Sequence, residues 1–475
     1  MSQEPTRRQF LRAATAAGVM GLAGLGCQGP ARRGAVPALV SPGCRTSKVR
    51  VARIYLGRPG GLWPTPTLDL EKEAARYRKH MAGMPDAFAD VDFVVDELVT
   101  KRDQMRRLKE TLQSVDGILA IHLSMGTWGI LPELLAAGRP TVLFAAPYSG
   151  HEWTGFGSRM DSKAGALLDC LLTSDLDQLA AAVRPFRALH HLREAKILNL
   201  TTRNFQGFAD AMKEKFGTEM VKLQRDRVLK AYEAVPEKDA QAEARRWTTG
   251  AEKVVEPSRE EIVKSSRLAL AMGRILEEEK ATVFTVDCYG TMWRKLPAYP
   301  CIGFARFNNL GLGGICESDL QSAMTHIIYQ GLVGRPGFVN DPTMDLSRDA
   351  IILAHCLGTP KMDGPDGEAA PYKLRSVMER REGAVPQVRM RLGQKVTQAK
   401  LVGPDRLLCF TGEIIDVPDH PRGCRTKITV KVDGDAERLW RNWSHGLHRV
   451  TCYGDLTDDL RRFCRFAGVE FVQEA

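Results

Sequence analysis

Short apolar runs alternate with longer amphipathic segments through the first three quarters of the chain. Four early runs have the length of β-strands and lie at residues 49–57, 92–99, 116–124 and 140–147. Segments with helical spacing separate them, near residues 68–81, 101–114 and 131–138. Strands that alternate with helices in this way indicate a parallel sheet covered by helices. We therefore predict a Rossmann-like or flavodoxin-like domain over residues 48–192.

The alternation resumes near residue 193 and the pattern changes near residue 363. Apolar runs at 195–201 and 281–288 enclose helical segments at 208–217 and 259–280. They predict a second α/β domain with a parallel sheet over residues 193–362. A boundary rich in Gly and Pro follows. Shorter β-like runs come next, at residues 384–392, 395–402, 406–415 and 426–432, and predict a β-rich, barrel-like C-terminal domain over 363–475.

The first residues of the chain have the pattern of an export signal. Arg7-Arg8-Gln9-Phe10-Leu11 precedes an apolar stretch that ends at Cys27, which predicts a twin-arginine signal over residues 1–27. The alternative is an apolar N-terminal helix after a chance pair of arginines. We expect a periplasmic protein or one anchored on the outer side of the membrane. Cys27 is a candidate lipid anchor, and residues 28–47 are predicted to be a linker.

Composition excludes several classes of function. The net charge is +10, but 67 Lys and Arg residues are scattered among 57 Asp and Glu residues. Without a basic cluster interleaved with aromatic residues, we predict no nucleic-acid partner. Eleven cysteines occur without CxxC spacing, which argues against a structural zinc module. No GxGxxG follows the first strand, so a dinucleotide site is not predicted.

The segment from Gly311 to His355 carries the residues best placed for chemistry. A glycine-rich loop leads to Glu317, and helical spacing begins at residue 319. Asp341 stands at the chain reversal before Pro342, and His355 ends an apolar strand. Ligands of parallel α/β sheets bind at such strand ends. From residue type alone, Glu317 can equally be a helix-start carboxylate and Asp341 a turn residue.

Aromatic and imidazole side chains elsewhere are candidates for sugar contact. Trp153 follows His151 and Glu152 in a loop after a predicted strand, where an indole ring can stack on a sugar. His445 and His448 lie three residues apart near the C-terminus. A histidine of this kind can also be a hydrogen-bonded interior residue.

These segments resemble the L-fucose and L-arabinose isomerase family, especially its fucose isomerase-like members. The resemblance rests on GLGGICESDLQSAMTHIIYQGLVGRPGFVNDP, on ILAHC, and on HGLHRVTCYGDLTDDLRRFCRFAGVEFV, and it covers most of the chain after the signal. It implies two α/β domains followed by a β-rich domain, and a homo-oligomer. In that family a Glu, an Asp and a late His hold a divalent cation, commonly Mn²⁺. The matching residues here are Glu317, Asp341 and His448, with His445 as the competing histidine.

The resemblance also implies a reaction. We predict a metal-dependent aldose–ketose isomerase that acts on a free sugar through an enediolate, with Glu317 and Asp341 as the catalytic acid/base groups. His355, His445 and Trp153 are the weaker candidates for substrate binding. The export signal and a chain shorter than typical fucose isomerases motivate the alternative, a noncatalytic exported carbohydrate-binding protein on an isomerase scaffold.

Overall fold

The computed structural model describes residues 47–61 and 63–475. The predicted twin-arginine signal, Cys27 and all but the last residue of the predicted linker lie outside these described residues. Within the described ranges, no helix combines the length and apolar character needed to cross a membrane. Four sheets, of five, four, seven and three strands, form the framework.

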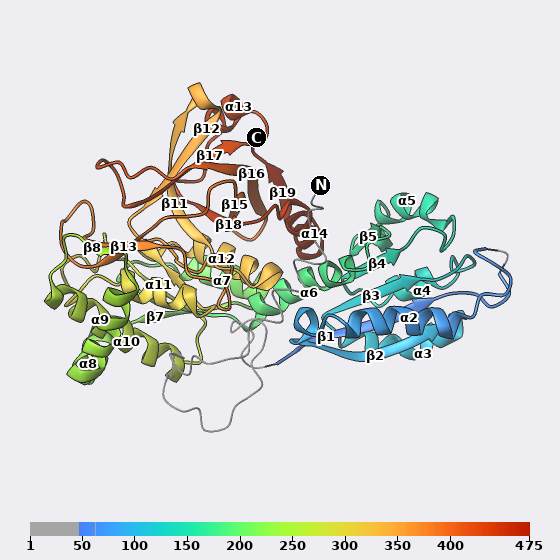
Figure 1. The fold of residues 1–475 in the computed structure, drawn as a ribbon. Helices are drawn as coiled ribbons and strands as arrows, with labels where there is room; N and C mark the ends of the chain where they lie inside the picture. The colour runs from blue at the N-terminus through green and yellow to red at the C-terminus, as the bar shows by residue number, and fades with distance from the viewer. Residues whose placement is uncertain (1–46, 62) are drawn as a thin grey trace, which may run out of the picture. The chain divides into compact units, whose positions relative to one another are not determined.

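The first sheet has five parallel strands in the order β2-β1-β3-β4-β5 (Figure 1). They are β1 (Val49–Leu56), β2 (Val91–Val99), β3 (Gly117–His122), β4 (Thr141–Ala145) and β5 (Leu168–Leu172). One face packs against α2 (Leu70–Ala82) and α6 (Gln178–Glu194), and the other against α3 (Arg102–Gln113), α4 (Leu131–Leu135) and α5 (Phe156–Met160). This is the strand order of flavodoxin-like folds, which confirms the predicted class.

The second sheet has four parallel strands in the order β10-β9-β6-β7. They are β6 (Lys196–Leu200), β7 (Glu219–Leu223), β9 (Val283–Val286) and β10 (Gly313–Ile315). Two hydrophobic clusters flank this sheet. One includes α8 (Arg225–Glu233), α9 (Glu237–Gly250), α10 (Arg259–Glu278) and α11 (Cys301–Asn309), and the other includes α7 (Gln206–Phe216) and α12 (Leu320–Val333). A capping box of Ser258 and Glu261 starts α10.

The C-terminal sheet closes into a barrel. Its order is β15-β18-β11-β12-β17-β16-β19, and pairing of β15 with β16 closes the first six of these strands into a ring, while β19 pairs with β16 in parallel. The strands are β11 (Phe338–Asp345), β12 (Ala350–His355), β15 (Lys395–Val402), β16 (Arg406–Asp416), β17 (Thr426–Val432), β18 (Arg449–Tyr453) and β19 (Glu470–Gln473). This confirms the predicted barrel-like region. Further elements include α13 (Ala436–Arg441) and a small sheet of β8 (Lys253–Val254), β13 (Tyr372–Arg375) and β14 (Val385–Val388).

Strands β11 and β12 lie in the barrel and not in the second parallel sheet, where the sequence pattern had placed them. β11 pairs with β12 and β18, and β12 also pairs with β17, all antiparallel. Their apolar runs suit a buried strand of either sheet. Only Glu317 therefore follows a strand of a parallel sheet, while Asp341 and His355 belong to antiparallel strands.

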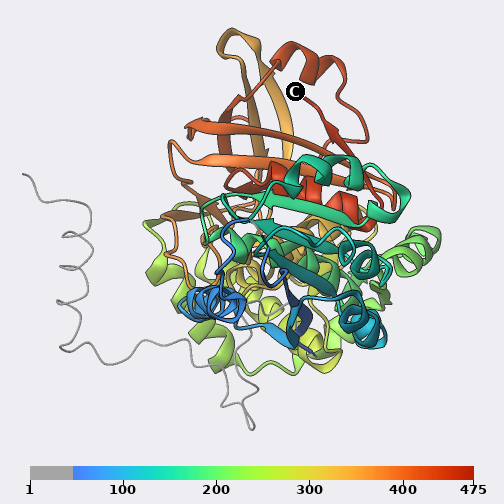
Figure 2. The same ribbon diagram turned by 90° about the vertical axis from the view of Figure 1, so that its right-hand side faces the viewer.

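Helix α14 (Thr457–Ala467) connects the barrel to the first sheet. Leu460 and Phe463 are buried in the cluster that includes barrel residues. On another side, Asp459 Oδ2 accepts a hydrogen bond of 2.8 Å from Arg184 of α6, and Arg462 forms an ion pair with Asp169 of β5. Figures 1 and 2 show α14, in red, beside α6 and β5. Helix α14 thus contacts both the barrel and the first sheet with its helix α6, which come from segments far apart in the sequence.

Helices α6 and α12 approach closely at Gly331. A Cβ atom there would lie 2.4 Å from the Cα of Ala188, so we expect Gly331→Ala to lower the free energy of unfolding by about 1–3 kcal/mol. Denaturant titration measures this. The matched control is Gly207→Ala in α7, where nothing lies within 4 Å of the added Cβ and stability should hold or rise by up to about 1 kcal/mol. Equal stability of both variants would contradict the tight contact.

Candidate metal centre

Glu317 reaches the site from a strained turn between β10 and α12. It lies in a short 3-10 helix, Cys316–Ser318, with φ of 62°, and Ser318 follows with φ of 58°. Left-handed backbone at residues other than glycine costs on the order of 1–3 kcal/mol each and tends to occur at functional sites. Ser318 Oγ donates a hydrogen bond of 2.7 Å to Asn199 Oδ1. The surrounding structure therefore holds Glu317 in an orientation that an ordinary turn would not give.

Strand register brings Asp341, His355 and His448 together. Asp341 of β11 pairs with Ala354 of β12, next to His355. Asn340 of β11 pairs with Arg449 of β18, so continuing that register by one residue sets His448 opposite Asp341. Three neighbouring antiparallel strands thus bring these side chains to one place on the barrel.

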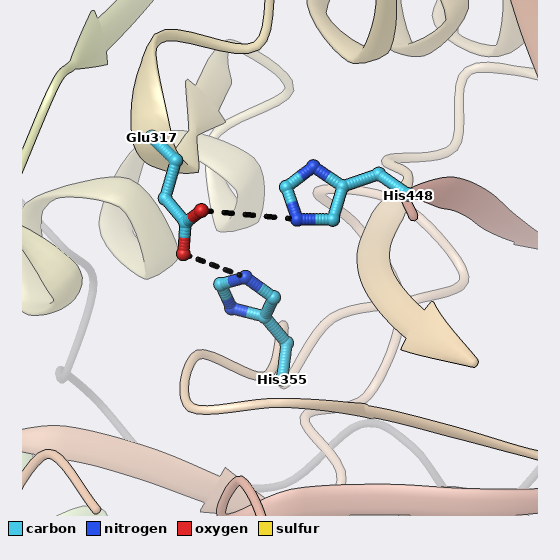
Figure 3. A group of neighbouring side chains, drawn as sticks. All are labelled: Glu317, His355 and His448. Atoms are coloured by element: carbon cyan, nitrogen blue, oxygen red, sulfur yellow. Dashed lines mark ion pairs between the residues drawn. The ribbon is translucent and has the colours of Figure 1, made fainter. Parts of the chain in front are cut away.

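The carboxylate of Glu317 lies between two imidazoles (Figure 3). Its Oε1 is 3.5 Å from His355 Nε2, and its Oε2 is 4.0 Å from His448 Nε2. Asp341 Oδ1 is 3.3 Å from the same His448 nitrogen. One ligand atom from each of Glu317, His355 and His448 lies within 4.8 Å of the others. Glu317, His355 and His448 therefore converge on one small space, and Asp341 adjoins it through His448.

Asp319 orients His448 and was not identified from the sequence as a site residue. His448 Nδ1 donates a hydrogen bond of 2.8 Å to Asp319 Oδ2, so Nε2 faces Glu317 and Asp341. Asp319 also caps α12, since its side chain accepts from the backbone N–H of Ser322. A carboxylate behind an imidazole fixes the ring and its tautomer, as around many metal ions. The sequence signal was an Asp at a helix start, which indicates only a cap.

Burial and the neighbouring charges shift the pKa values of this group. Burial lowers the pKa of His448, but hydrogen bonds and charges of Asp319 and Asp341 outweigh it and raise the pKa to about 10. Burial raises the pKa of the Asp319 and Asp341 carboxyls, yet hydrogen bonding to His448 and the nearby positive charges bring both below their ordinary value. In the cation-free protein, the group is therefore an imidazolium held by carboxylates.

The residues fit a divalent cation. His355 is buried, and neither of its ring nitrogens has a hydrogen-bond partner within the described part of the chain. An unpaired buried polar group is costly, and a cation would satisfy it. Carboxylate oxygens and imidazole nitrogens suit Mn²⁺ and related divalent ions. His355, which the sequence suggested only as a weak substrate contact, thus belongs to the same donor group as Glu317 and His448.

Two other predicted site residues lie elsewhere. His445 is exposed, and its backbone carbonyl accepts a hydrogen bond of 2.8 Å from Lys400 Nζ. Trp153 is 53% exposed in the first α/β unit, in a 3-10 helix over Glu152–Gly155. Within the described residues, 47–61 and 63–475, neither side chain contacts Glu317, His355 or His448.

A cavity of about 390 Å³ is lined by residues that include Glu261 of α10, Cys288 and Pro300, and its lining does not include Glu317, Asp341, His355 or His448. Cys288 lines the cavity, and the backbone of Glu317 hydrogen-bonds to the Cys288 thiol. Burial raises the pKa of that thiol to about 12, which makes it a packing residue and not a nucleophile. Cavities of this size hold small ligands, and the contact between Cys288 and Glu317 links this cavity to the turn that carries Glu317.

Asp319→Asn should weaken cation binding without unfolding α12. Asn is as good a helix cap as Asp, but it holds the His448 imidazole less firmly, and loss of such a partner typically lowers metal affinity about 10–100-fold. Calorimetric titration with Mn²⁺ measures the change. Asp69→Asn, at the cap of α2, is the matched control and should bind as the unmodified protein does. Unchanged Mn²⁺ affinity in Asp319→Asn would show that Asp319 does not orient His448 for cation binding.

Cation binding should release a proton. Because the pKa of His448 is about 10 without a cation, the imidazole is protonated at neutral pH and must lose that proton to become a ligand. Affinity should rise about tenfold per pH unit between about pH 6 and 8, with about one proton released per chain. Calorimetry in buffers of different ionisation enthalpy measures this. Affinity independent of pH would contradict it.

The raised pKa of His448 makes folding stability fall with increasing pH, whereas cation affinity rises. A histidine whose pKa is raised on folding stabilises the cation-free protein fully below its unfolded value of 6.5, and this contribution is lost as pH rises through about 10. The cation-free protein should therefore lose stability over the pH range in which cation affinity increases.

Comparison with known proteins gives two relatives. No protein-family model matches the chain. It is 24% identical over 226 residues to sulfoquinovose isomerase of Alkalicoccus urumqiensis, covering 45% of this chain and 48% of the relative. It is 25% identical over 300 residues to sulfoquinovose isomerase of Clostridium sp. (strain MSTE9), covering 58% and 63%. The chain thus spans less than two thirds of the length of these curated relatives.

Proposed function

We propose that this protein is a metal-dependent aldose–ketose isomerase that acts on a free sugar through an enediolate. The observation that carries the proposal is the convergence of Glu317, His355 and His448, with Asp341 Oδ1 3.3 Å from His448 Nε2. Mn²⁺ is the first cation to test, because the donor set suits it. Similarity to two proteins named sulfoquinovose isomerase supports the reaction class.

The two carboxylates would move protons during the reaction. Isomerisation takes a proton from C2 of the aldose and returns one to C1, while the hydroxyl proton at O2 passes to O1. A bound divalent cation would supply Lewis acidity to the two adjacent sugar oxygens. One carboxylate of the Glu317 and Asp341 pair accepts the carbon-bound proton and returns it, and the other transfers the hydroxyl proton. No net proton is gained or lost.

His448 and His355 would hold the cation together with the carboxylates of Glu317 and Asp341, which would also exchange the protons. His448 keeps its orientation through Asp319, and β11 and β18 fix its distance from Asp341. Burial of His355 excludes water from one side of the site. A desolvated site strengthens each electrostatic interaction with charge that develops in the transition state.

The test is turnover of a defined panel of sugars. Purified full-length protein loaded with Mn²⁺ is incubated with aldoses in D₂O, with sulfoquinovose first because the two relatives carry that name. The proposal predicts formation of the matching ketose, with partial incorporation of solvent deuterium at C1, because the carboxylate that takes the proton from C2 can exchange it with solvent before it protonates C1. A folded, metal-loaded protein that converts no sugar would contradict the isomerase. Sugar binding without turnover would instead favour the noncatalytic carbohydrate-binding protein.

A further inference from the structure

A second group of metal-ligating side chains begins at the residue next to His355. Cys356, Glu379 and Cys424 each offer one ligand atom, and these atoms lie within 4.8 Å of one another. Cys356 follows β12, Glu379 lies between β13 and β14, and Cys424 precedes β17. The group shares no residue with Glu317, His355 and His448. Successive residues of an extended strand point to opposite sides, which is consistent with His355 and Cys356 serving different groups.

Two sulfur-to-carboxylate distances, each to a different oxygen of Glu379, are close to the separation of neighbouring ligand atoms around a tetrahedral ion. Cys356 Sγ lies 3.4 Å from Glu379 Oε2, and Cys424 Sγ lies 3.3 Å from Glu379 Oε1. Zinc binds thiolate sulfur at about 2.3 Å and carboxylate oxygen at about 2.0–2.2 Å, so neighbouring ligand atoms of a tetrahedral site are about 3.6–3.8 Å apart. The observed separations differ from these by a few tenths of an ångström. Side-chain adjustment alone can therefore complete the site.

Neighbouring groups hold the ligands in place. Tyr289 donates its hydroxyl proton to Glu379 Oε2 over 2.8 Å, and the backbone N–H of Met378 donates to Cys356 Sγ over 3.4 Å. Partners of this kind orient metal ligands and tune them. Cys356 is buried, Cys424 is half-buried and Glu379 is exposed, so an ion can enter from solvent on the Glu379 side.

We propose that Cys356, Glu379 and Cys424 form a thiolate site for a borderline or soft cation such as Zn²⁺, separate from the centre around Glu317. Thiolates select zinc over manganese or magnesium, whereas oxygen and imidazole donors suit manganese. Three protein ligands leave a fourth position for water. An ion at Cys356 would also fix the end of β12 and with it the position of His355. The site does not depend on sugar isomerisation.

Cobalt spectroscopy tests the site directly. The full chain, kept reduced, is titrated with Co²⁺ alone. One thiolate-bound cobalt per chain should produce a near-ultraviolet sulfur-to-cobalt charge-transfer band and the strong visible bands of a tetrahedral ion. Added Zn²⁺ should remove these bands and added Mg²⁺ should not.

Variants separate this site from the centre around Glu317. Cys424→Ser and Glu379→Gln should each abolish the bands or sharply reduce them. Cys424 is half-buried and Glu379 is exposed, so the fold of both variants should persist, which circular dichroism checks. Cys170→Ser, a half-buried cysteine of β5, and Glu317→Gln should keep the bands. Tyr289→Phe should weaken Co²⁺ binding about 10–100-fold.

Two results would overturn the proposal. One is a reduced, folded chain in which thiol titration finds Cys356 and Cys424 free but Co²⁺ gives no charge-transfer band. The other is a band that persists at full strength in Cys424→Ser, which would assign the cobalt to other cysteines. Neither result involves sugar turnover, so a failure of the proposed thiolate site can be distinguished from a failure of the proposed isomerase function.

Discussion

Glu317→Gln is expected to lower kcat/KM for sugar isomerisation by about 10²–10⁴-fold, the range for loss of a positioned acid/base group. The amide keeps the size of the side chain but cannot accept the substrate proton, and it is a weaker ligand for a cation. Glu317 is only half-buried, and its strained backbone does not depend on the carboxylate. The free energy of unfolding should therefore change little, and activity should fall far more than stability.

Steady-state kinetics with the turned-over sugar and denaturant titration measure the two quantities. Glu437→Gln, at an exposed acid of α13, is the matched control and should keep its activity. A Glu317→Gln enzyme with at least half of the original kcat/KM would exclude Glu317 as an acid/base group. If the original protein binds sugar without turnover and Glu317→Gln binds it equally well, the carbohydrate-binding alternative is correct.

Arg449→Met is expected to lower the free energy of unfolding by about 3–5 kcal/mol, as when one partner of a buried ion pair is removed. Arg449 is fully buried, and it donates hydrogen bonds of 3.0 and 2.6 Å to the buried carboxylate of Glu474. The variant would leave that carboxylate buried without a partner. Arg449 also donates to the backbone carbonyl of His448 over 3.1 Å, so Mn²⁺ affinity should fall as well.

The matched control is Arg406→Met. Arg406 pairs with Glu470 at 2.8 Å between neighbouring strands, but both side chains are about half exposed, and exposed pairs contribute about 0–1 kcal/mol. Thermal and denaturant unfolding compare the two variants. Adding Glu474→Gln to Arg449→Met should recover part of the loss, because it removes the unpaired charge. If Arg449→Met were as stable as Arg406→Met, the buried pair would not be holding the His448 segment.

Local pattern was enough to predict the two parallel sheets and the barrel, because helical and strand periodicities differ along the chain. It was not enough to assign β11 and β12. Their apolar runs fit either sheet, and the choice depends on pairing with β17 and β18, whose paired residues lie 71 to 113 positions away in the sequence. The apolar periodicity of β11 and β12 does not indicate which strands, so distant in the sequence, they pair with.

The candidate site, too, could be predicted from the sequence only in part. Residue type left Glu317 open to a helix-start role and Asp341 to a turn, and only the family resemblance grouped them with His448. The structure places His448, and not His445, beside Asp341, because the register of β11 with β18 decides which imidazole faces the carboxylates. Asp319 carried a plain capping signal, and its contact with His448 arises from a segment 129 residues away.

The most direct test of the account is a crystal structure of the full chain grown with Mn²⁺, with anomalous diffraction to locate the ion. The account predicts one strong anomalous peak bounded by Glu317, Asp341, His355 and His448. It is contradicted if manganese binds elsewhere, or if the four side chains surround no anomalous peak in protein that isomerises sugar.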